Sequence, residues 1–326
     1  MRATIRAALM VALGAVLLAG CGSSSDRPQR MALAALGVSG TLPAPSASTT
    51  IARSCGDVTA SLRRPTAMPA PGAMPQGSFM QRIQRRGYLV AGVDQNTLLF
   101  AYFNPLDSPP QLEGFEIDML HRLAKAIFGD PNRIKFRAIT TDERIDAVRS
   151  GKVDVVADAM TITCARRQQV DFSTVYYDAG QKILVPSNST ARSAADLAGK
   201  RVCVTKGSTS YSTLRQLYPT VIPYTVPQRT DCLVKMQQGL VDAVTSDDAI
   251  LLGFKAQDPN TKIVGPRFAD EPYGIAIRQD HPEFVRFVNG VLAQMRADGT
   301  WQSIYTRWLG KLSPSTPPPP AAHYDG

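Results

Sequence analysis

Between residues 79 and 254, short apolar runs rich in β-branched residues alternate with segments whose apolar residues recur at helical spacing. The run 88–93 is followed by a helical pattern at 115–128, and a second set of the same kind occupies 201–254. In such an alternation each helix returns the chain to the same edge of a sheet, which gives βαβ units with parallel strands. We therefore predict an α/β protein with helices on both faces of its sheets.

Two extended stretches, 176–186 and 272–277, flank the second set and lie where a chain would cross between two lobes. We predict lobe 1 over 78–184 plus 271–311 and lobe 2 over 185–270, with parallel-rich sheets joined by two hinge strands. Ligands of open parallel sheets bind beyond the carboxyl ends of the strands. The cleft between the lobes is therefore the expected site.

The start of the chain is typical of an export signal. Two arginines precede an apolar run, 7–19, that is too short to span a bilayer. Residues 18–21, Leu-Ala-Gly-Cys, resemble the bacterial lipobox, whose cysteine is diacylated after cleavage; the alternative is an ordinary signal peptide followed by a chance cysteine. We predict a signal peptide at 1–20 and lipidation of Cys21 by acyl chains such as palmitate. This would anchor the protein on the extracytoplasmic face of the cell membrane.

Both ends of the remaining chain have the composition of linkers. Residues 21–77 are rich in Ser, Ala and Pro, and four consecutive prolines lie in the segment 312–326. Such segments bury too little apolar surface to offset their ordering entropy. We predict a lipidated flexible tether at 21–77 and a proline-rich tail at 312–326; if Cys55 is disulfide-bonded, only the part of the tether before it is free.

With Cys21 assigned to lipid, four cysteines remain, and in an exported protein they indicate two disulfides with three possible connectivities. Cys203 and Cys232 lie in the same predicted lobe, so we pair them. Cys55 and Cys164 follow by elimination. A zinc site is not indicated, because no CxxC or His-rich cluster accompanies these cysteines.

Charge and motifs exclude several function classes. The net charge is +9, but Lys and Arg are spread along the chain and no nucleic-acid-binding motif is present. The three histidines form no metal-binding or catalytic pattern, and there is no nucleophile motif or phosphate loop. We predict that the protein is not an enzyme and uses no cofactor or metal.

The segment 160–177 carries the most specific signal. It reads Met-Thr-Ile-Thr-Cys-Ala-Arg-Arg-Gln-Gln-Val-Asp-Phe-Ser-Thr-Val-Tyr-Tyr. A strand end, then a hydroxyl and then Arg166 at the start of a helix suit a carboxylate, because the guanidinium offers two parallel donors and the helix N-terminus adds free N–H groups. Taken alone, such an arginine is more often a surface residue.

The whole string resembles the polar amino-acid family of ABC-transporter substrate-binding proteins, solute-binding protein family 3. Further matches, in the family's order, are Gly-Phe-Glu-Ile-Asp at 114–118, Gly-Lys-Val-Asp-Val-Val at 151–156, Asp-Leu-Ala-Gly-Lys at 196–200 and Asp-Gly-Thr-Trp at 298–301. The resemblance covers nearly all of 85–310 and implies a periplasmic-binding-protein-like fold. The cysteines and the proline-rich tail also resemble actinobacterial glutamine/glutamate-binding lipoproteins.

The resemblance implies a role for individual residues. Arg166 would hold the ligand α-carboxylate, while Thr161 and the backbone around Thr209 would add donors to the same oxygens. Asp247 would take the α-ammonium, although its position also suits a helix N-cap. The predicted ligand-binding set is completed by Asp94, Phe100, Ala159, Lys206 and Ser208. For Phe100, a place in the core is an equal alternative.

Two positions depart from the family pattern. Ala159 stands where the family has Gly, and Thr141 lies where many members place an aromatic side chain. Lys206 could reach a side-chain carboxylate, with an exposed loop lysine as the alternative. We expect a monomer that closes around glutamate, aspartate, glutamine or asparagine and delivers it to ABC permease subunits. The rival interpretations are a membrane-coupled sensor of amino acids and an exported dehydratase built on the same fold.

Overall fold

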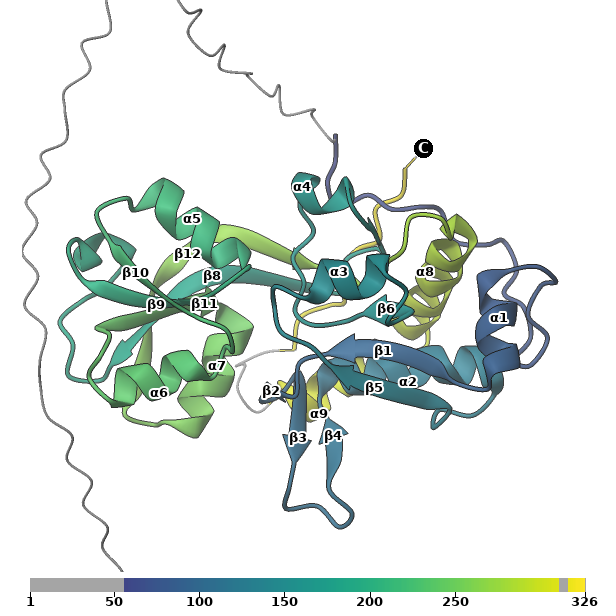
Figure 1. Ribbon diagram of the computed structural model, residues 1–326, viewed down its shortest axis with the longest axis horizontal. Helices are drawn as coiled ribbons and strands as arrows, with labels where there is room; N and C mark the ends of the chain where they lie inside the picture. The colour runs from purple at the N-terminus through teal and green to yellow at the C-terminus, as the bar shows by residue number, and fades with distance from the viewer. Residues whose placement is uncertain (1–55, 311–315, 326) are drawn as a thin grey trace, which may run out of the picture. The chain divides into compact units, whose positions relative to one another are not determined.

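The computed structural model describes residues 56–310 and 316–325, and within them the chain forms two α/β lobes (Figure 1). The sheet of lobe 1 has the strand order β5-β1-β6-β13-β7, and β1 runs parallel to both of its neighbours. Its strands are β1 (Leu89–Val93), β5 (Ile134–Ala138), β6 (Val155–Val156), β7 (Asp171–Phe172) and β13 (Ala276–Ile277). The predicted fold class is confirmed.

Six helices of the described chain belong to lobe 1, and all except the single turn Cys164–Arg167 pack apolar side chains into its core. They are α1 (Phe79–Arg86), α2 (Phe115–Phe128), α3 (Arg144–Arg149), α4 (Cys164–Arg167), α8 (Pro282–Ala297) and α9 (Thr300–Trp308). The side chains of α2 that recur at helical spacing, including Ile117, Leu120 and Leu123, are buried in the core. Among the described residues, no helix is long and apolar enough to span a membrane.

Lobe 2 has the strand order β10-β9-β11-β8-β12. Its strands are β8 (Tyr177–Pro186), β9 (Arg201–Thr205), β10 (Ile222–Val226), β11 (Ala243–Asp247) and β12 (Thr261–Tyr273). Its helices are the 3-10 turn η1 (Ala194–Leu197), α5 (Thr209–Leu217), α6 (Asp231–Gln237) and α7 (Asp248–Gln257). The strands β9, β10 and β11 are parallel to one another. The strand β8 runs antiparallel to both of its neighbours, β11 and β12.

The two crossings between the lobes are β8 and β12, which pair from Tyr177↔Tyr273 to Pro186↔Thr261. Each crossing is therefore also a strand of the lobe 2 sheet. The lobe boundaries expected at 184/185 and 270/271 fall inside these strands. This arrangement places Glu271 and Tyr273 of β12 beside the cleft.

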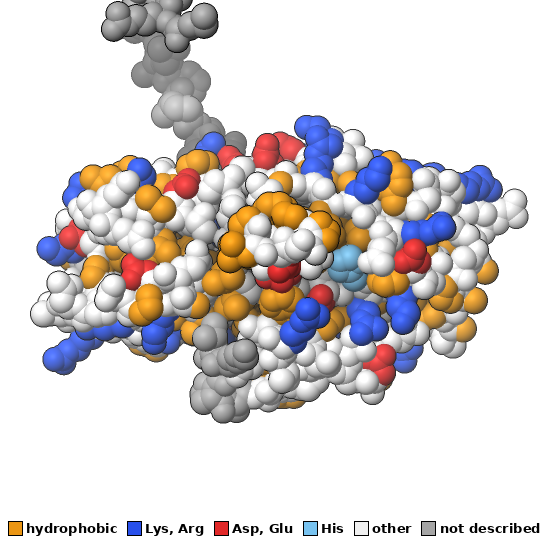
Figure 2. Space-filling view, turned by 90° about the horizontal axis from the view of Figure 1, so that it is seen from below, with side chains coloured by type: hydrophobic (Ala, Val, Ile, Leu, Met, Phe, Trp, Pro, Cys, Tyr) orange, Lys and Arg blue, Asp and Glu red, His pale blue; other side chains and the backbone are white. Residues whose placement is uncertain are grey.

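A small sheet of β2 (Asn96–Thr97), β3 (Ala101–Asn104) and β4 (Gln111–Glu113) was not predicted. Its β3–β4 hairpin projects from lobe 1 (Figure 1), and Leu106 at the tip is 92% exposed. Seen from below, hydrophobic side chains gather where the hairpin faces the viewer, while Lys and Arg are scattered over the face (Figure 2).

Two of the cysteines, Cys203 on β9 and Cys232 on α6, form a disulfide. Cys164 is also disulfide-bonded. Cys55 and Cys21 lie outside the described residues, so the predicted partner of Cys164 and the lipidation remain predictions.

The described parts of the two predicted linkers, residues 56–77 and 316–325, are not free but bound to lobe 1. Ser61 donates its hydroxyl to Phe172 O at 2.6 Å and accepts from Asn289 Nδ2 at 2.8 Å, so the described part of the predicted tether packs on lobe 1. In the predicted tail, Asp325 N donates to Ser61 O, and Pro320 O accepts from Arg296. Specific hydrogen bonds to lobe 1 hold these segments where their composition predicts mobility.

Candidate ligand-binding site

A small cavity lies between the lobes at the ends of their central strands. Lobe 1 lines it with Thr141, Arg144, Ala159 and Thr161, and lobe 2 lines it with Thr205, Ser208, Thr209, Ser210, Arg229, Ser246, Asp247 and Ile250. Five of the predicted ligand-binding residues line this cavity: Ala159, Thr161, Ser208, Thr209 and Asp247. Thr141, where the family has an aromatic side chain, also lines it.

Arg166 lies next to this cavity. Thr163 caps α4 by accepting a hydrogen bond from Arg166 N, and the guanidinium donates to Thr161 O at 2.7 Å and to Gly207 O at 3.3 Å. Among the described residues, no carboxylate lies within ion-pair distance of Arg166. Burial lowers the pKa of Arg166 to about 9, and the nearby Arg144 adds to this effect. A buried guanidinium held only by neutral carbonyls is a suitable partner for an anionic ligand group.

The hydroxyls of Thr161 and Thr209 both donate to Glu271 Oε2, the second at 2.6 Å. The two threonines predicted to contact the ligand α-carboxylate thus hold a carboxylate of the protein. Burial raises the pKa of Glu271, although the two hydroxyls and Arg166 oppose that shift. Sequence reasoning missed Glu271, because it directly precedes the stretch 272–277, which was interpreted only as a crossing.

Asp247 ends β11 and stands at the N-cap position of α7, but its side chain makes no capping hydrogen bond. Instead it accepts from Tyr273 OH at 2.6 Å and from Ser210 Oγ at 3.4 Å. Burial, and then the negative charge of Glu271, raise the pKa of Asp247 to about 7. The carboxylate is thus turned into the cavity, where an ammonium group would stabilise its ionised form.

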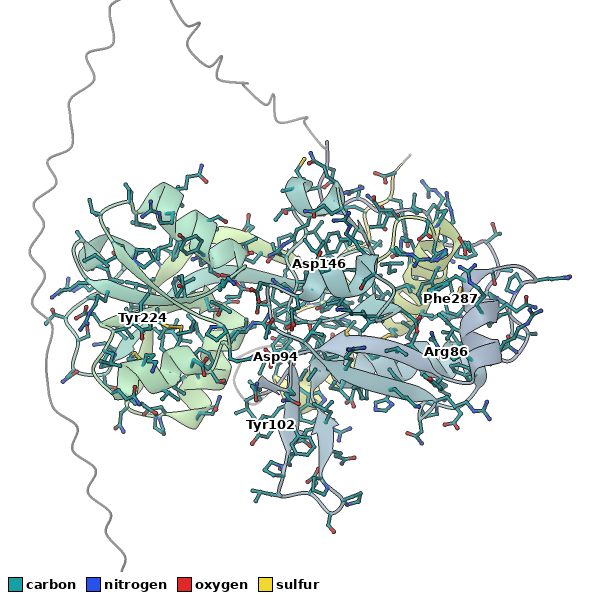
Figure 3. All side chains as sticks on the ribbon, viewed as in Figure 1. Arg86, Asp94, Tyr102, Asp146, Tyr224 and Phe287 are labelled. Atoms are coloured by element: carbon teal, nitrogen blue, oxygen red, sulfur yellow. A yellow bond between two sulfur atoms is a disulfide. The ribbon has the colours of Figure 1, made fainter. Side chains whose placement is uncertain are left out.

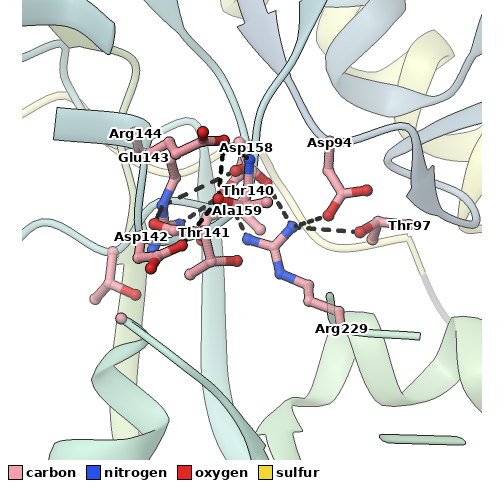
Figure 4. Close-up of polar contacts among 12 residues, drawn as sticks. Asp94, Thr97, Thr140, Thr141, Asp142, Glu143, Arg144, Asp158, Ala159 and Arg229 are labelled. Atoms are coloured by element: carbon pink, nitrogen blue, oxygen red, sulfur yellow. Dashed lines mark hydrogen bonds and ion pairs between the residues drawn. The ribbon is translucent and has the colours of Figure 1, made fainter. Parts of the chain in front are cut away.

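Asp94 lies between the lobes at the end of β1 (Figure 3). Its Oδ2 accepts from Arg229 Nη1 at 3.0 Å, and the same nitrogen donates to Thr97 Oγ1 at 3.3 Å and to Asp158 Oδ1 (Figure 4). Arg229 Nη2 donates to Asp158 O at 3.0 Å. All three charged side chains are at most 4% exposed. The predicted ligand contact Asp94 is therefore paired with a cation from the opposite lobe.

Arg144 supplies a second cation to this network. Its Nε donates to Thr141 O at 2.8 Å, its Nη1 donates to Asp158 O at 2.9 Å, and it lies 3.9 Å from the Asp158 carboxylate. Sequence reasoning missed Arg144, Asp158 and Arg229. Arg144 lies three residues after Thr141, and Asp158 directly precedes Ala159, both of which were considered. Arg229 has no motif around it.

The structure places Phe100 and Lys206 away from the cavity. Phe100 is fully buried in the lobe 1 core, in edge contact with Tyr177, in agreement with the core alternative. The Lys206 side chain is 69% exposed and pairs with Asp142 Oδ2 at 2.9 Å. At the adjacent Gly207, with φ +75°, a Cβ would lie 2.7 Å from Asp142 Cβ, so the lobes meet closely at this point.

Ala159 adopts a left-handed conformation (φ 42°), which accounts for the family's glycine at this position. Its N–H donates to Glu116 Oε1 at 2.6 Å, and Tyr176 OH donates to the same oxygen. Burial, and then the negative charge of Asp158, raise the pKa of Glu116 to about 7.

No group of three or more His, Cys, Asp or Glu in the described part of the chain is arranged to hold a metal ion.

A sequence model of a family described as "Bacterial extracellular solute-binding proteins, family 3" matches residues 89–311. The "ABC transporter glutamine-binding protein GlnH" of Bacillus subtilis is 36% identical over 68% of this chain and 81% of its own length. The "Glutamate/aspartate import solute-binding protein" of Escherichia coli is 27% identical over 74% of this chain and 81% of its own.

Solved structures show the same similarity. "An ancestral arginine-binding protein bound to glutamine" has a TM-score of 0.64 and 37% identity, covering 69% of this chain and 99% of that one. "The ancestral amino acid-binding protein AncCDT-1, a precursor of cyclohexadienyl dehydratase" has a TM-score of 0.64 and 32% identity, covering 71% and 99%.

Proposed function

Because the chain belongs to the bacterial extracellular solute-binding proteins of family 3, we propose that it captures one polar amino acid between its lobes for an ABC importer. The observation that carries the proposal is a pair of buried charged groups: the carboxylate of Asp247, which lines the cavity, and the guanidinium of Arg166, which donates to the lining residue Thr161. A zwitterion needs both of its charges matched, because one buried unpaired charge costs several kcal/mol. The α-carboxylate would take Arg166 and the α-ammonium would take Asp247.

The proposed ligand is glutamate, aspartate, glutamine or asparagine. The names of the relatives, which include a glutamine-binding and a glutamate/aspartate protein, support this class. The exposure of Lys206 and its pairing with Asp142 remove the reason to place it on the ligand side chain. Two guanidinium groups, Arg144 and Arg229, line the cavity instead and can donate to an amide or carboxylate oxygen.

The remaining parts of the proposal concern the setting. The lipobox-like sequence ending at Cys21 supports a lipid anchor, and the family supports an extracytoplasmic location. We propose a monomer that docks in its closed form on permease subunits, after closure of the lobes about β8 and β12. A membrane sensor that reads the same closed form is the alternative partner.

Calorimetric titration of the lipid-free protein with the twenty standard amino acids tests the proposal. We expect tight binding of at least one of the four named amino acids and recovery of that amino acid unchanged from the complex, as for a receptor without catalytic turnover. Arg166→Ala should weaken binding more than roughly a hundredfold, since the buried α-carboxylate would lose the cation assigned to it. Arg149→Ala, an exposed arginine of lobe 1, serves as the control. Silence across the panel from folded protein, or normal binding by Arg166→Ala, would refute the proposal.

A further inference from the structure

Two arginines, Arg144 from lobe 1 and Arg229 from lobe 2, line the cavity together with Asp247. Behind Arg229 lie Asp94, Thr97 and Asp158, which accept its hydrogen bonds. Two buried carboxylates and a hydroxyl around one guanidinium form the kind of site that would bind a cationic ligand side chain. Here the protein's own arginine occupies that site.

We infer that Arg229 fills the side-chain subsite as an internal cation and thereby excludes amino acids with cationic side chains. This inference rests on the proposed function and assigns its specificity. An incoming arginine or lysine side chain could reach Asp94 and Asp158 only by displacing Arg229. A neutral or anionic side chain leaves the pairs intact and can accept a hydrogen bond from the arginines that line the cavity.

The exclusion is linked to closure, because Arg229 and its acceptors come from different lobes. Arg229 precedes α6 in lobe 2, whereas Asp94 and Asp158 follow β1 and β6 in lobe 1. A cation bound to the two carboxylates in an open protein would oppose closure, since the returning Arg229 would meet an occupied site and a like charge. A ligand without a positive side chain lets the guanidinium complete the site.

A covalent link supports the position of Arg229. Cys232 N donates to Arg229 O at 3.1 Å, and Cys232 is bonded to Cys203 on β9. The disulfide therefore ties the start of α6, and with it the turn that carries Arg229, to the central strands of the lobe 2 sheet. Precise placement matters here, because Arg229 makes four hydrogen bonds with both of its terminal nitrogens.

The test is calorimetric titration of wild type, Arg229→Ala and Arg229→Lys with glutamine, arginine and lysine. We expect wild type to bind glutamine and to give no measurable heat with the two cations. Arg229→Ala should gain arginine binding by about tenfold or more, since the two carboxylates regain a cation. Arg229→Lys should retain the exclusion, and Arg215→Ala, an exposed arginine of the same lobe, should behave as wild type.

A second measurement, of the melting temperature, keeps the inference testable if Arg229→Ala is less stable than wild type. Millimolar methylguanidinium should raise the melting temperature of Arg229→Ala by several degrees and leave wild type and Arg215→Ala unchanged. The inference is overturned if wild type binds arginine as tightly as glutamine, or if Arg229→Ala gains neither arginine affinity nor stabilisation by methylguanidinium. Failure of wild type to bind any amino acid would instead refute the proposed function, since the methylguanidinium readout does not depend on an amino-acid ligand.

Discussion

Oγ1 of Thr209 donates a 2.6 Å hydrogen bond to Oε2 of Glu271, which joins the first turn of α5 to the strand β12 that returns to lobe 1. The hydroxyl of Thr161, from lobe 1, donates to the same oxygen. One carboxylate thus links the two lobes through the hydroxyl of Thr161, a residue that the resemblance assigns to the ligand, and the hydroxyl of Thr209, whose backbone it assigns to the ligand. The ligand α-carboxylate and Glu271 would compete for these hydroxyls.

Replacement of Glu271 by Gln is expected to strengthen amino-acid binding by about tenfold. The amide keeps an oxygen for one hydroxyl but removes a negative charge near the ligand α-carboxylate, and like charges in a buried site repel strongly. Titration of Glu271→Gln against wild type measures the change, with Asp270→Asn, an exposed neighbour on β12, as the matched control. Unchanged or weaker binding in Glu271→Gln would show that Glu271 supports the bound state instead of competing with it.

The sequence predicted the two α/β lobes and their main elements, because alternating apolar runs and helical patterns are local signals. Local signals could not predict the network of buried ion pairs in the cleft. Arg229 reaches Asp94 and Asp158 across 135 and 71 residues of chain, and no local pattern marks a side chain that is paired only after two lobes meet. For Phe100 and Lys206 the structure agrees with the alternatives, a core residue and an exposed loop lysine, because proximity to a strand end or to a glycine does not determine where a side chain points.

Amino-acid binding should weaken as the pH falls below about 7. The Asp247 carboxylate has its pKa raised to about 7 by burial and by Glu271, while Tyr273, Arg229 and Asp248 also face it. An ammonium ligand requires the ionised form, so each pH unit below the pKa of the free protein should reduce affinity by up to roughly tenfold. Titrations at pH 5, 6, 7 and 8 would show this trend.

The matched variant for this experiment is Asp247→Asn. We expect it to bind much more weakly and with little dependence on pH, since its amide does not titrate. A wild-type affinity that is constant from pH 5 to pH 8 would contradict the assignment of Asp247 to the ligand ammonium.

Glu116 should make the folded protein less stable as the pH rises from about 4.5 to about 7. Its pKa is raised from 4.5 to about 7 by burial and by Asp158, so the folded state keeps a proton that the unfolded chain has released. The contribution of Glu116 to the free energy of unfolding is therefore fully present below the ordinary pKa of 4.5. It is lost as the pH rises through the pKa of the folded state, by about 3 kcal/mol if the whole shift is realised. Urea unfolding of wild type and Glu116→Gln at pH 5 and pH 8 compares the two slopes.

In Glu116→Gln this pH-dependent contribution is absent, because the amide does not titrate. The amide oxygen can still accept hydrogen bonds from Tyr176 OH and Ala159 N. The gap between the variant and wild type should therefore widen in favour of the variant at pH 8. Glu113→Gln, on β4 outside the cleft, controls for the loss of a carboxylate elsewhere. A parallel loss of stability with pH in Glu116→Gln would assign the effect to other groups.

The N-terminal segment is held on lobe 1 by Asn289, which is fully buried on α8. Its Nδ2 donates to Ser61 Oγ and Leu62 O, and its Oδ1 accepts from Thr174 N at 2.7 Å. Asn289→Ala should lower the free energy of unfolding by roughly 2–3 kcal/mol, because it leaves buried polar groups without partners. It should also make the bonds near residue 61 accessible to protease in native conditions, while the exposed Asn132→Ala leaves both properties unchanged. Wild-type stability and protease resistance in Asn289→Ala would mean that residues 56–77 are held on lobe 1 by other contacts and that Asn289 is not the residue that fixes them.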